Sequence, residues 1–245
     1  MLAQKPGACR PRGCKPCADM LVNADLSRRA VVTPDEYTWV ASPQTGVDRM
    51  MLDRDGGERA RATSLVRYAP DSFFPPHAHP QGEEILVLSG VFSEAEAHFP
   101  AGWYLRNPPG SSHQPASAGG ALIFVKLRHM KRDEREPVRV DTNDERQWRS
   151  LPGGGARCYL FSDASEAIGL LRLPAGATLP WRNAAELFVL EGELQAEGRK
   201  LPTGSWMRMP PGDNMEMLVG AEGAKLYLRI LLPDAALQRQ WKGEA

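Results

Sequence analysis

Three histidines and one glutamate in the first half of the chain have the residue types and spacing of a metal-binding set. His77 and His79 are two residues apart, so both imidazoles would leave the same face of an extended strand. Glu83 follows after a short turn, and His113 comes much later, behind a proline-proline-glycine turn. Three imidazoles and one carboxylate converging from two strands suit a divalent first-row transition metal. We therefore predict one mononuclear metal site in this stretch.

An isolated His-x-His pair is more often a solvated surface feature than a metal site. Here the pair is accompanied by a nearby carboxylate, by Gly90 at the end of the next predicted strand and by a distant third histidine. The chain has 5 histidines, and His98 and His129 fall outside the pattern. We expect these two to be ordinary surface or strand residues.

The same stretch resembles the two sequence motifs of the cupin family. The first motif is matched by His77-x-His79-x3-Glu83-x6-Gly90, and the second by Pro108-x-Gly110-x2-His113. Residues 82–88 and 106–110, with residues 62–68 upstream, are similar to the ChrR-type cupins in particular. The resemblance is good over residues 35–130, and the rest of the chain matches only as a weaker second copy.

This resemblance implies a double-stranded β-helix with the metal inside the barrel. It also implies that the metal ligands are His77, His79, Glu83 and His113. The chain has Ser117 where many cupins carry an asparagine, which departs from the general second motif but not from the ligand set. Regulatory members of the family carry an N-terminal helical domain that holds a sigma factor, and the segment before this barrel is too short for such a domain.

An internal repeat sets the expected architecture. The pattern Trp39-x3-Pro43-x2-Gly46 recurs as Trp148-x3-Pro152-x2-Gly155, an offset of 109. Residues 87–90 and 99–110 recur at 189–192 and 201–212, an offset of 102. Similarity at a near-fixed period over two long segments indicates two copies of one fold. Apolar or alternating runs bounded by glycine and proline predict strands. They are expected at residues 63–69, 84–92, 121–129, 167–173, 186–194 and 225–232.

We therefore predict an all-β fold with two tandem double-stranded β-helix (jelly-roll, cupin) barrels in one chain. Residues 1–20 are expected to form a disordered tail, residues 21–136 the N-terminal cupin with the metal site, and residues 137–245 the C-terminal cupin. A short helix is expected at residues 234–241.

The second copy lacks the metal-binding residues. At the offset of 102, His113 falls on Met215 and Glu83 on Ala185, and the His-x-His pair falls on residues 179–181, or on 181–183 with a two-residue deletion. Apolar side chains cannot hold such a cation against water, so we predict a metal-free second barrel with an apolar interior. Its expected role is to cover a sheet face of the first barrel, with binding of an apolar ligand as the alternative.

The balance of 30 basic and 30 acidic residues gives a formal net charge of +0, which argues against nucleic acid or an anionic membrane as an obligatory partner. No apolar run approaches the ~18 residues of a membrane helix, and the N-terminus lacks the apolar region of a secretory signal. We expect a cytoplasmic protein whose partner is a small-molecule ligand or substrate, with a homodimer as an open alternative.

The 4 cysteines do not indicate a disulfide framework. Cys9, Cys14 and Cys17 could give three thiolates to zinc, but a fourth ligand is missing nearby, so an unstructured tail is the preferred interpretation. Cys158 sits in an apolar stretch and is expected to be a small core residue.

Six large side chains near the ligands are candidates for lining the metal pocket, although strand parity does not decide which of them point inward. They are Arg67, Tyr68, Phe74, Trp103, Tyr104 and Arg106. A guanidinium beside a metal could hold a substrate carboxylate. However, Arg106 has a counterpart in the metal-free copy, Arg208, which favours a structural role. We therefore name no catalytic residue.

Three functions stay open from the sequence. The first is a metal centre that acts on or senses a small molecule. The second is a non-heme metal dioxygenase of diketone-like substrates, a reaction known among similar single cupins. The third is a structural or partner-binding barrel stapled by zinc. The expected ion is zinc or iron, with manganese, nickel and cobalt as alternatives, because three histidines and a glutamate suit all of them.

Overall fold

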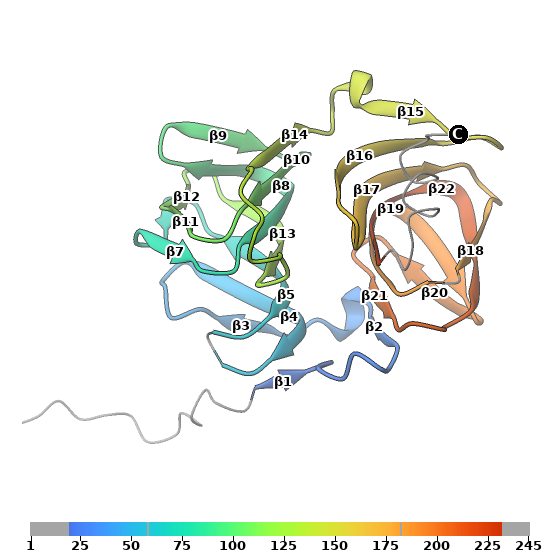
Figure 1. The fold of residues 1–245 in the computed structure, drawn as a ribbon, viewed down its shortest axis with the longest axis horizontal. Coiled ribbons are helices and arrows are strands. Elements are labelled where there is room, and N and C mark those ends of the chain that lie inside the picture. Colours follow the sequence, from blue (N-terminus) through green and yellow to red (C-terminus); the bar gives the residue numbers. More distant parts are fainter. Residues whose placement is uncertain (1–19, 58, 182, 232–245) are drawn as a thin grey trace, which may run out of the picture.

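Both halves of the chain form barrels because their apolar and alternating runs become antiparallel strands that roll up around separate cores. The computed structural model describes residues 20–57, 59–181 and 183–231. Within these ranges the two barrels lie side by side, and the helical segments are two short 3-10 helices, Pro34–Glu36 and Glu145–Gln147 (Figure 1). No helix in the described ranges has the length and apolar character needed to cross a membrane.

The strands confirm the predicted all-β fold of two barrels. In the first half they are β1 (Leu21–Val22), β2 (Ala30–Val32), β3 (Trp39–Ala41), β4 (Val47–Asp55), β5 (Ala62–Tyr68), β6 (Ser72–Phe73), β7 (His77–His79), β8 (Glu83–Glu94), β9 (Ala97–Pro100), β10 (Trp103–Asn107), β11 (Ser111–His113), β12 (Pro115–Ser117) and β13 (Ala121–Leu127). In the second half they are β14 (Val138–Asp141), β15 (Trp148–Ser150), β16 (Ala156–Ser162), β17 (Glu166–Leu173), β18 (Thr178–Trp181), β19 (Ala185–Ala196), β20 (Arg199–Pro202), β21 (Trp206–Met209) and β22 (Met215–Leu231).

The strands expected from the sequence correspond to β5, β8 and β13 in the first barrel and to β17, β19 and β22 in the second. The last of these starts at Met215 and not near residue 225. The strand is longer than expected because its first part pairs with β18 and its second part pairs with β17.

Each barrel is completed by a strand from the other copy. The sheet order is β1-β4-β5-β13-β8-β10-β14 in the first barrel and β15-β16-β17-β22-β19-β21-β2 in the second. β14 follows residue 136 in the sequence yet pairs with β10, and β2 comes from the start of the chain yet pairs with β21. The two copies thus exchange one strand each, β2 and β14. The boundary between residues 136 and 137 therefore separates the two sequence copies, but β2 and β14 each pair with the barrel on the other side of that boundary.

The core is divided into one cluster inside each barrel and a third cluster between the barrels. In the cluster between the barrels Phe124 stacks on Phe188 with ring centroids 5.1 Å apart, and the ring of Tyr227, which belongs to the second barrel like Phe188, lies 5.1 Å from that of Phe124. Cys158 is buried in this cluster, in keeping with its expected role as a small core residue. The second barrel covers a sheet face of the first, as expected.

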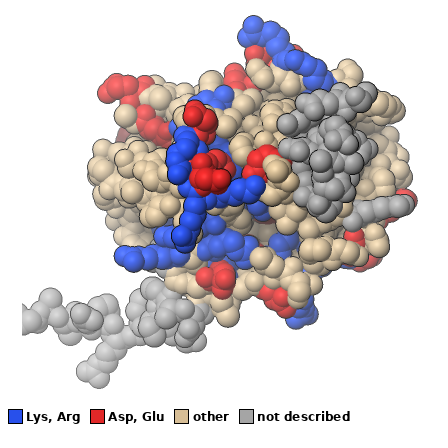
Figure 2. All heavy atoms as spheres, viewed as in Figure 1, with Lys and Arg blue, Asp and Glu red and all other residues tan. Residues whose placement is uncertain are grey.

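Buried ion pairs cross the same interface. Arg106 of the first barrel lies 2.9 Å from Glu84 of the same barrel and 2.8 Å from Glu166 of the second barrel. Lys126 of the first barrel pairs with Glu186 of the second. Buried charges are tolerated when they are paired in this way. On the surface, Figure 2 shows basic and acidic side chains lying next to one another along the line between the barrels.

Two expectations concern parts of the chain outside the described residues. These are the tail at residues 1–19, with Cys9, Cys14 and Cys17, and the short helix at residues 234–241.

Candidate metal centre

A small two-stranded ribbon brings two of the predicted ligands face to face. β7 and β11 pair in antiparallel fashion, with His77 directly opposite His113 and His79 opposite Ser111. Residues directly opposite one another in such a pair project to the same face. The alternation along β7 places His79 on that face as well. All three imidazoles therefore point to one volume.

Glu83 reaches the same volume because the chain turns tightly at Gly82. The backbone φ of Gly82 is 74°, and a Cβ atom there would lie 2.2 Å from the Met130 sulfur. Only glycine fits this turn without displacing Met130. Glu83 then opens β8 with its carboxylate buried in the barrel.

The donor atoms of His79, Glu83 and His113 lie close enough to share one ion, and so do those of the three histidines. His79 Nε2 lies 2.8 Å from His113 Nε2, and Glu83 Oε2 lies 3.4 Å from His79 Nε2 and 3.3 Å from His113 Nε2. The ligand atoms of His77, His79 and His113 lie within 4.8 Å of one another. Donor atoms held about 2.1 Å from an ion are about 3.0 Å apart at right angles and about 3.4 Å apart in a tetrahedron. The distances fit this range.

Hydrogen bonds at the far side of two rings orient them for metal binding. His77 Nδ1 donates to the Pro75 carbonyl at 2.9 Å, which leaves the lone pair on Nε2. His113 Nδ1 donates to Glu94 Oε1 at 2.6 Å, with the same consequence for its Nε2. A second hydrogen bond of this kind fixes the tautomer of a metal-binding histidine and raises its basicity.

His113 is supported by a group of residues that the predicted ligand set does not include. Asn107 Nδ2 donates to Glu94 at 3.1 Å, and an Arg139 Nη2 donates to the other Glu94 oxygen at 3.1 Å. Arg139 belongs to the exchanged strand β14. The signal that could have found this group lies in the repeat. The counterparts of Glu94, Asn107 and His113 at the offset of 102 are Ala196, Met209 and Met215.

The electrostatics favour a bound cation. Burial raises the pKa of Glu83 to about 7. Burial, together with the neighbouring His113 and His77, lowers the pKa of His79 to about 3, so that ring is neutral near pH 7. Burial alone would lower the pKa of His113, but Glu94 and Glu83 raise it. The apo site therefore holds a carboxylate that is costly to ionise, and a divalent ion would remove that cost.

A cleft of about 310 Å³ adjoins these residues and includes His77, His79 and Glu83 in its lining. Its apolar walls are Val66, Tyr68, Phe74, Ile123, Val125 and Leu127. Its basic lining residues are Arg49, Arg54 and Arg128. The cleft therefore combines an apolar interior with positive charge, a setting for a small and partly polar molecule.

Of the six candidates for lining the pocket, Tyr68 and Phe74 do so and the other four do not. Arg67 points to the other face of β5, where it pairs with Asp48 at 2.8 Å. Trp103 packs against Phe99 with ring centroids 5.4 Å apart. Neighbouring strand residues alternate in direction, and the sequence does not say which set faces inward.

Tyr104 and Arg106, the other two, face the second barrel. Tyr104 belongs to the inter-barrel cluster, and Arg106 is fully paired with carboxylates at the interface. These contacts agree with the structural role inferred for Arg106.

The corresponding volume of the second barrel is apolar. Trp181 lies opposite Met215 in the pairing of β18 with β22, as His77 lies opposite His113. This register selects the alignment with the two-residue deletion. Trp181, Ala185 and Met215 are all buried in the second barrel's core. Within the described part of the chain, the two clusters of His, Cys, Asp and Glu close enough to hold a metal both lie in the first barrel.

Comparison with known proteins agrees with this architecture. The family model of the ChrR cupin-like domain matches the chain twice, at residues 27–131 and 135–230. No curated protein matches the chain.

Three solved structures illustrate the likeness of fold. A proposed dioxygenase from Nostoc punctiforme is 12% identical with a TM-score of 0.68, the match covering 83% of this chain and 82% of that one. A proposed glyoxylate-induced protein from Pseudomonas aeruginosa is 16% identical with a TM-score of 0.67, covering 91% and 94%. A bacterial pirin from Escherichia coli in complex with nickel(II) is 13% identical with a TM-score of 0.59, covering 84% and 100%.

Proposed function

Since this chain belongs to the family of ChrR cupin-like domains and carries two copies of the domain, we propose that its first barrel is a metal-dependent site for a small molecule. One divalent first-row transition metal is held by His77, His79, Glu83 and His113. The observation that carries the proposal is the convergence of three imidazole nitrogens and one carboxylate oxygen beside a cleft of about 310 Å³. Zinc and iron are the first candidates, and the nickel(II) complex of a pirin of similar fold keeps nickel among the alternatives.

Each part of the chain has a separate task in this site. The ion would supply Lewis-acid or redox chemistry to a bound molecule. Tyr68, Phe74 and the aliphatic wall residues exclude water from the cleft. Glu94 holds His113 in one tautomer. Arg128 Nη1 donates to Gln81 at 2.9 Å at the lining of the cleft, where its positive charge favours an anionic or carbonyl-rich ligand.

The position of the site supports ligand binding over a purely structural staple. His77 is half-buried and lines the cleft, so the donor set borders the space that a small molecule would occupy. A structural zinc is closed off by its four ligands, whereas a functional site keeps a position open.

An azide titration of the cobalt(II)-loaded protein tests this proposal. We expect azide to change the visible absorption spectrum of the ion, because an open position accepts the anion. The Glu96→Gln variant, altered at an exposed residue, should give the same spectral change. An unchanged spectrum at saturating azide would contradict an open site and support the staple.

A dioxygenase acting on a diketone-like substrate is the second candidate. It is supported by the apolar cleft beside a donor set that suits Fe(II), and by the similar fold of a proposed dioxygenase. Oxygen uptake by the Fe(II)-loaded protein with a panel of β-diketones tests it. We expect uptake that disappears in His113→Ala, and no uptake with any diketone would remove this candidate.

A further inference from the structure

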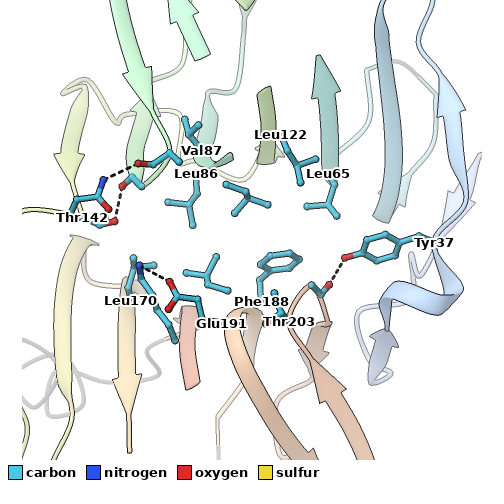
Figure 3. Close-up of a pocket in the computed structure, with 17 residues that line it drawn as sticks. Tyr37, Leu65, Leu86, Val87, Leu122, Thr142, Leu170, Phe188, Glu191 and Thr203 are labelled. Carbon is cyan, nitrogen blue, oxygen red and sulfur yellow. Dashed lines mark hydrogen bonds and ion pairs between the residues drawn. The ribbon is translucent and has the colours of Figure 1, made fainter. Parts of the chain in front are cut away.

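A second cleft lies between the two barrels, and its lining shares no residue with the cleft at the metal centre. Its volume is about 350 Å³, within the range of small-molecule sites. Figure 3 shows apolar side chains from the two barrels facing each other across it. They are Leu65, Leu86, Leu88 and Leu122 on one wall and Leu170, Phe188 and Leu190 on the other.

The two walls are equivalent parts of the two copies. Leu86 lies opposite Phe124 in the pairing of β8 with β13, and Phe188 lies opposite Tyr227 in the pairing of β19 with β22. The same offset of 102 relates Leu88 to Leu190. A cleft built from equivalent surfaces of two copies would be apolar on both sides if the copies had stayed alike.

The two walls differ in charge at one place. Leu122 lies opposite Ser89 in the first barrel. At the equivalent place in the second barrel, Lys225 lies opposite Glu191. Leu122, Lys225 and Glu191 all line the cleft. One wall has therefore gained a positive charge at the position where the other wall keeps a leucine.

Lys225 is held loosely enough to accept another partner. Its side chain is 16% exposed, and Nζ lies 3.4 Å from Glu191 Oε1, whose side chain is 71% exposed. An ion pair with so exposed a carboxylate contributes little and can be replaced by a better-placed anion. The Trp148 ring, with its centroid 5.9 Å from Nζ, adds an apolar neighbour to the ammonium group.

We propose that the cleft between the barrels binds a small molecule with an apolar body and one carboxylate. The body lies between the two leucine-rich walls, and the carboxylate replaces Glu191 as the partner of Lys225. An apolar cavity of about 150 Å³ holds benzene. The cleft of about 350 Å³ therefore suits a medium-chain or a bicyclic carboxylate.

Calorimetric titration of the full chain with octanoate, and with octanamide as the uncharged match, tests the proposal. We expect saturable binding of octanoate and binding of octanamide that is roughly tenfold weaker, because the amide lacks the charge that Lys225 pairs with. Lys225→Met should weaken octanoate roughly tenfold and leave octanamide unchanged. Glu191→Gln should strengthen octanoate, since it removes the competing carboxylate.

Two controls separate this cleft from other sites. Lys200→Met removes an exposed lysine on β20 and should leave octanoate binding unchanged. Stripping the metal with a chelator should also leave it unchanged. An affinity that does not respond to Lys225→Met, equal binding of acid and amide, or loss of octanoate binding on chelation would each overturn the proposal. The last result would place the carboxylate on the metal.

Discussion

At the scale of single residues, Glu94 distinguishes the first barrel from the second as clearly as the four predicted metal ligands do. Its carboxylate accepts hydrogen bonds from His113 and Asn107. In the second copy the counterparts of these three residues are Ala196, Met209 and Met215. Arginines at the barrel interface, by contrast, are present in both copies. The second copy therefore lacks the counterpart of Glu94 together with the counterparts of the predicted ligands, although its fold is the same.

Replacing Glu94 tests its role as a positioning residue. We expect Glu94→Ala to weaken zinc binding about 10- to 100-fold, because the His113 ring loses the acceptor that fixes its tautomer. Glu94→Gln should recover part of the affinity, since its amide oxygen can still accept from Nδ1. Competition with a zinc-binding dye measures both. Equal affinities for Glu94→Ala and the wild type would show that Glu94 does not act through His113.

The raised pKa of Glu83 predicts how metal stabilisation depends on pH. Burial raises this pKa to about 7, so the folded apo protein is destabilised by the carboxylate as pH rises above the usual carboxyl range. A metal ion removes that cost at high pH, and protons compete with it at low pH. We expect the increase in Tm on adding zinc to become smaller from about pH 8 to about pH 6.

Thermal unfolding at several pH values, with and without zinc, measures this effect. His113→Ala is the matched control and should show little zinc-dependent increase at any pH. A stabilisation that grows toward acid pH would contradict the predicted role of Glu83.

At the scale of elements, Gly90 shows why the first cupin motif ends in glycine. Its φ is 71°, and a Cβ atom there would lie 2.0 Å from the Gly120 carbonyl oxygen of the neighbouring backbone. In the second copy a Cβ atom at Gly192 would lie at the same distance, 2.0 Å, from the Gly223 carbonyl oxygen. Gly110 also has a positive φ, 86°, but open space around it. The motif therefore records a close approach of two backbone segments.

This contrast gives a matched pair of substitutions. We expect Gly110→Ala to lower the free energy of unfolding by about 1–2 kcal/mol, the cost of the left-handed backbone alone. Gly90→Ala should cost clearly more, about 4 kcal/mol, because the backbone must also move. Urea unfolding measures both, and equal losses would contradict the predicted clash.

The elements also show what the sequence could predict. β5, β8 and β13 were predictable because their apolar runs and bounding turns are local features. The convergence of the three histidines was predictable in part because spacing on a strand fixes the face. The pocket lining was not, because Arg67 and Tyr68 are neighbours with opposite directions and nothing local tells which of them faces the barrel interior.

At the scale of the whole molecule, the two barrels are joined by exchanged strands and by buried charges. The repeat revealed two copies, but it could not reveal that β2 and β14 pair with the opposite barrel, because both pairings satisfy the same local pattern. The exchange also carries Arg139 of β14 to Glu94. Part of the support for the metal centre therefore comes from beyond the first sequence repeat.

The buried arginine at the interface gives a prediction at this scale. We expect Arg106→Leu to lower the free energy of unfolding by about 3–5 kcal/mol, because it removes the guanidinium shared by buried carboxylates of both barrels, Glu84 and Glu166. Arg67→Leu, which breaks an exposed pair with Asp48, should cost about 0–1 kcal/mol. Similar losses in the two variants, measured by urea unfolding, would contradict the importance of the interface network.

Metal content is the most direct test of the site in the first barrel. Elemental analysis is made on protein purified without added metals or nickel affinity, for the wild type, His113→Ala and His98→Ala. We expect about one equivalent of a divalent transition metal per chain in the wild type and in His98→Ala, and a large loss in His113→Ala. A wild-type chain that binds no ion after zinc or iron is supplied, or a His113→Ala chain that keeps its full equivalent, would contradict a centre built from these four residues.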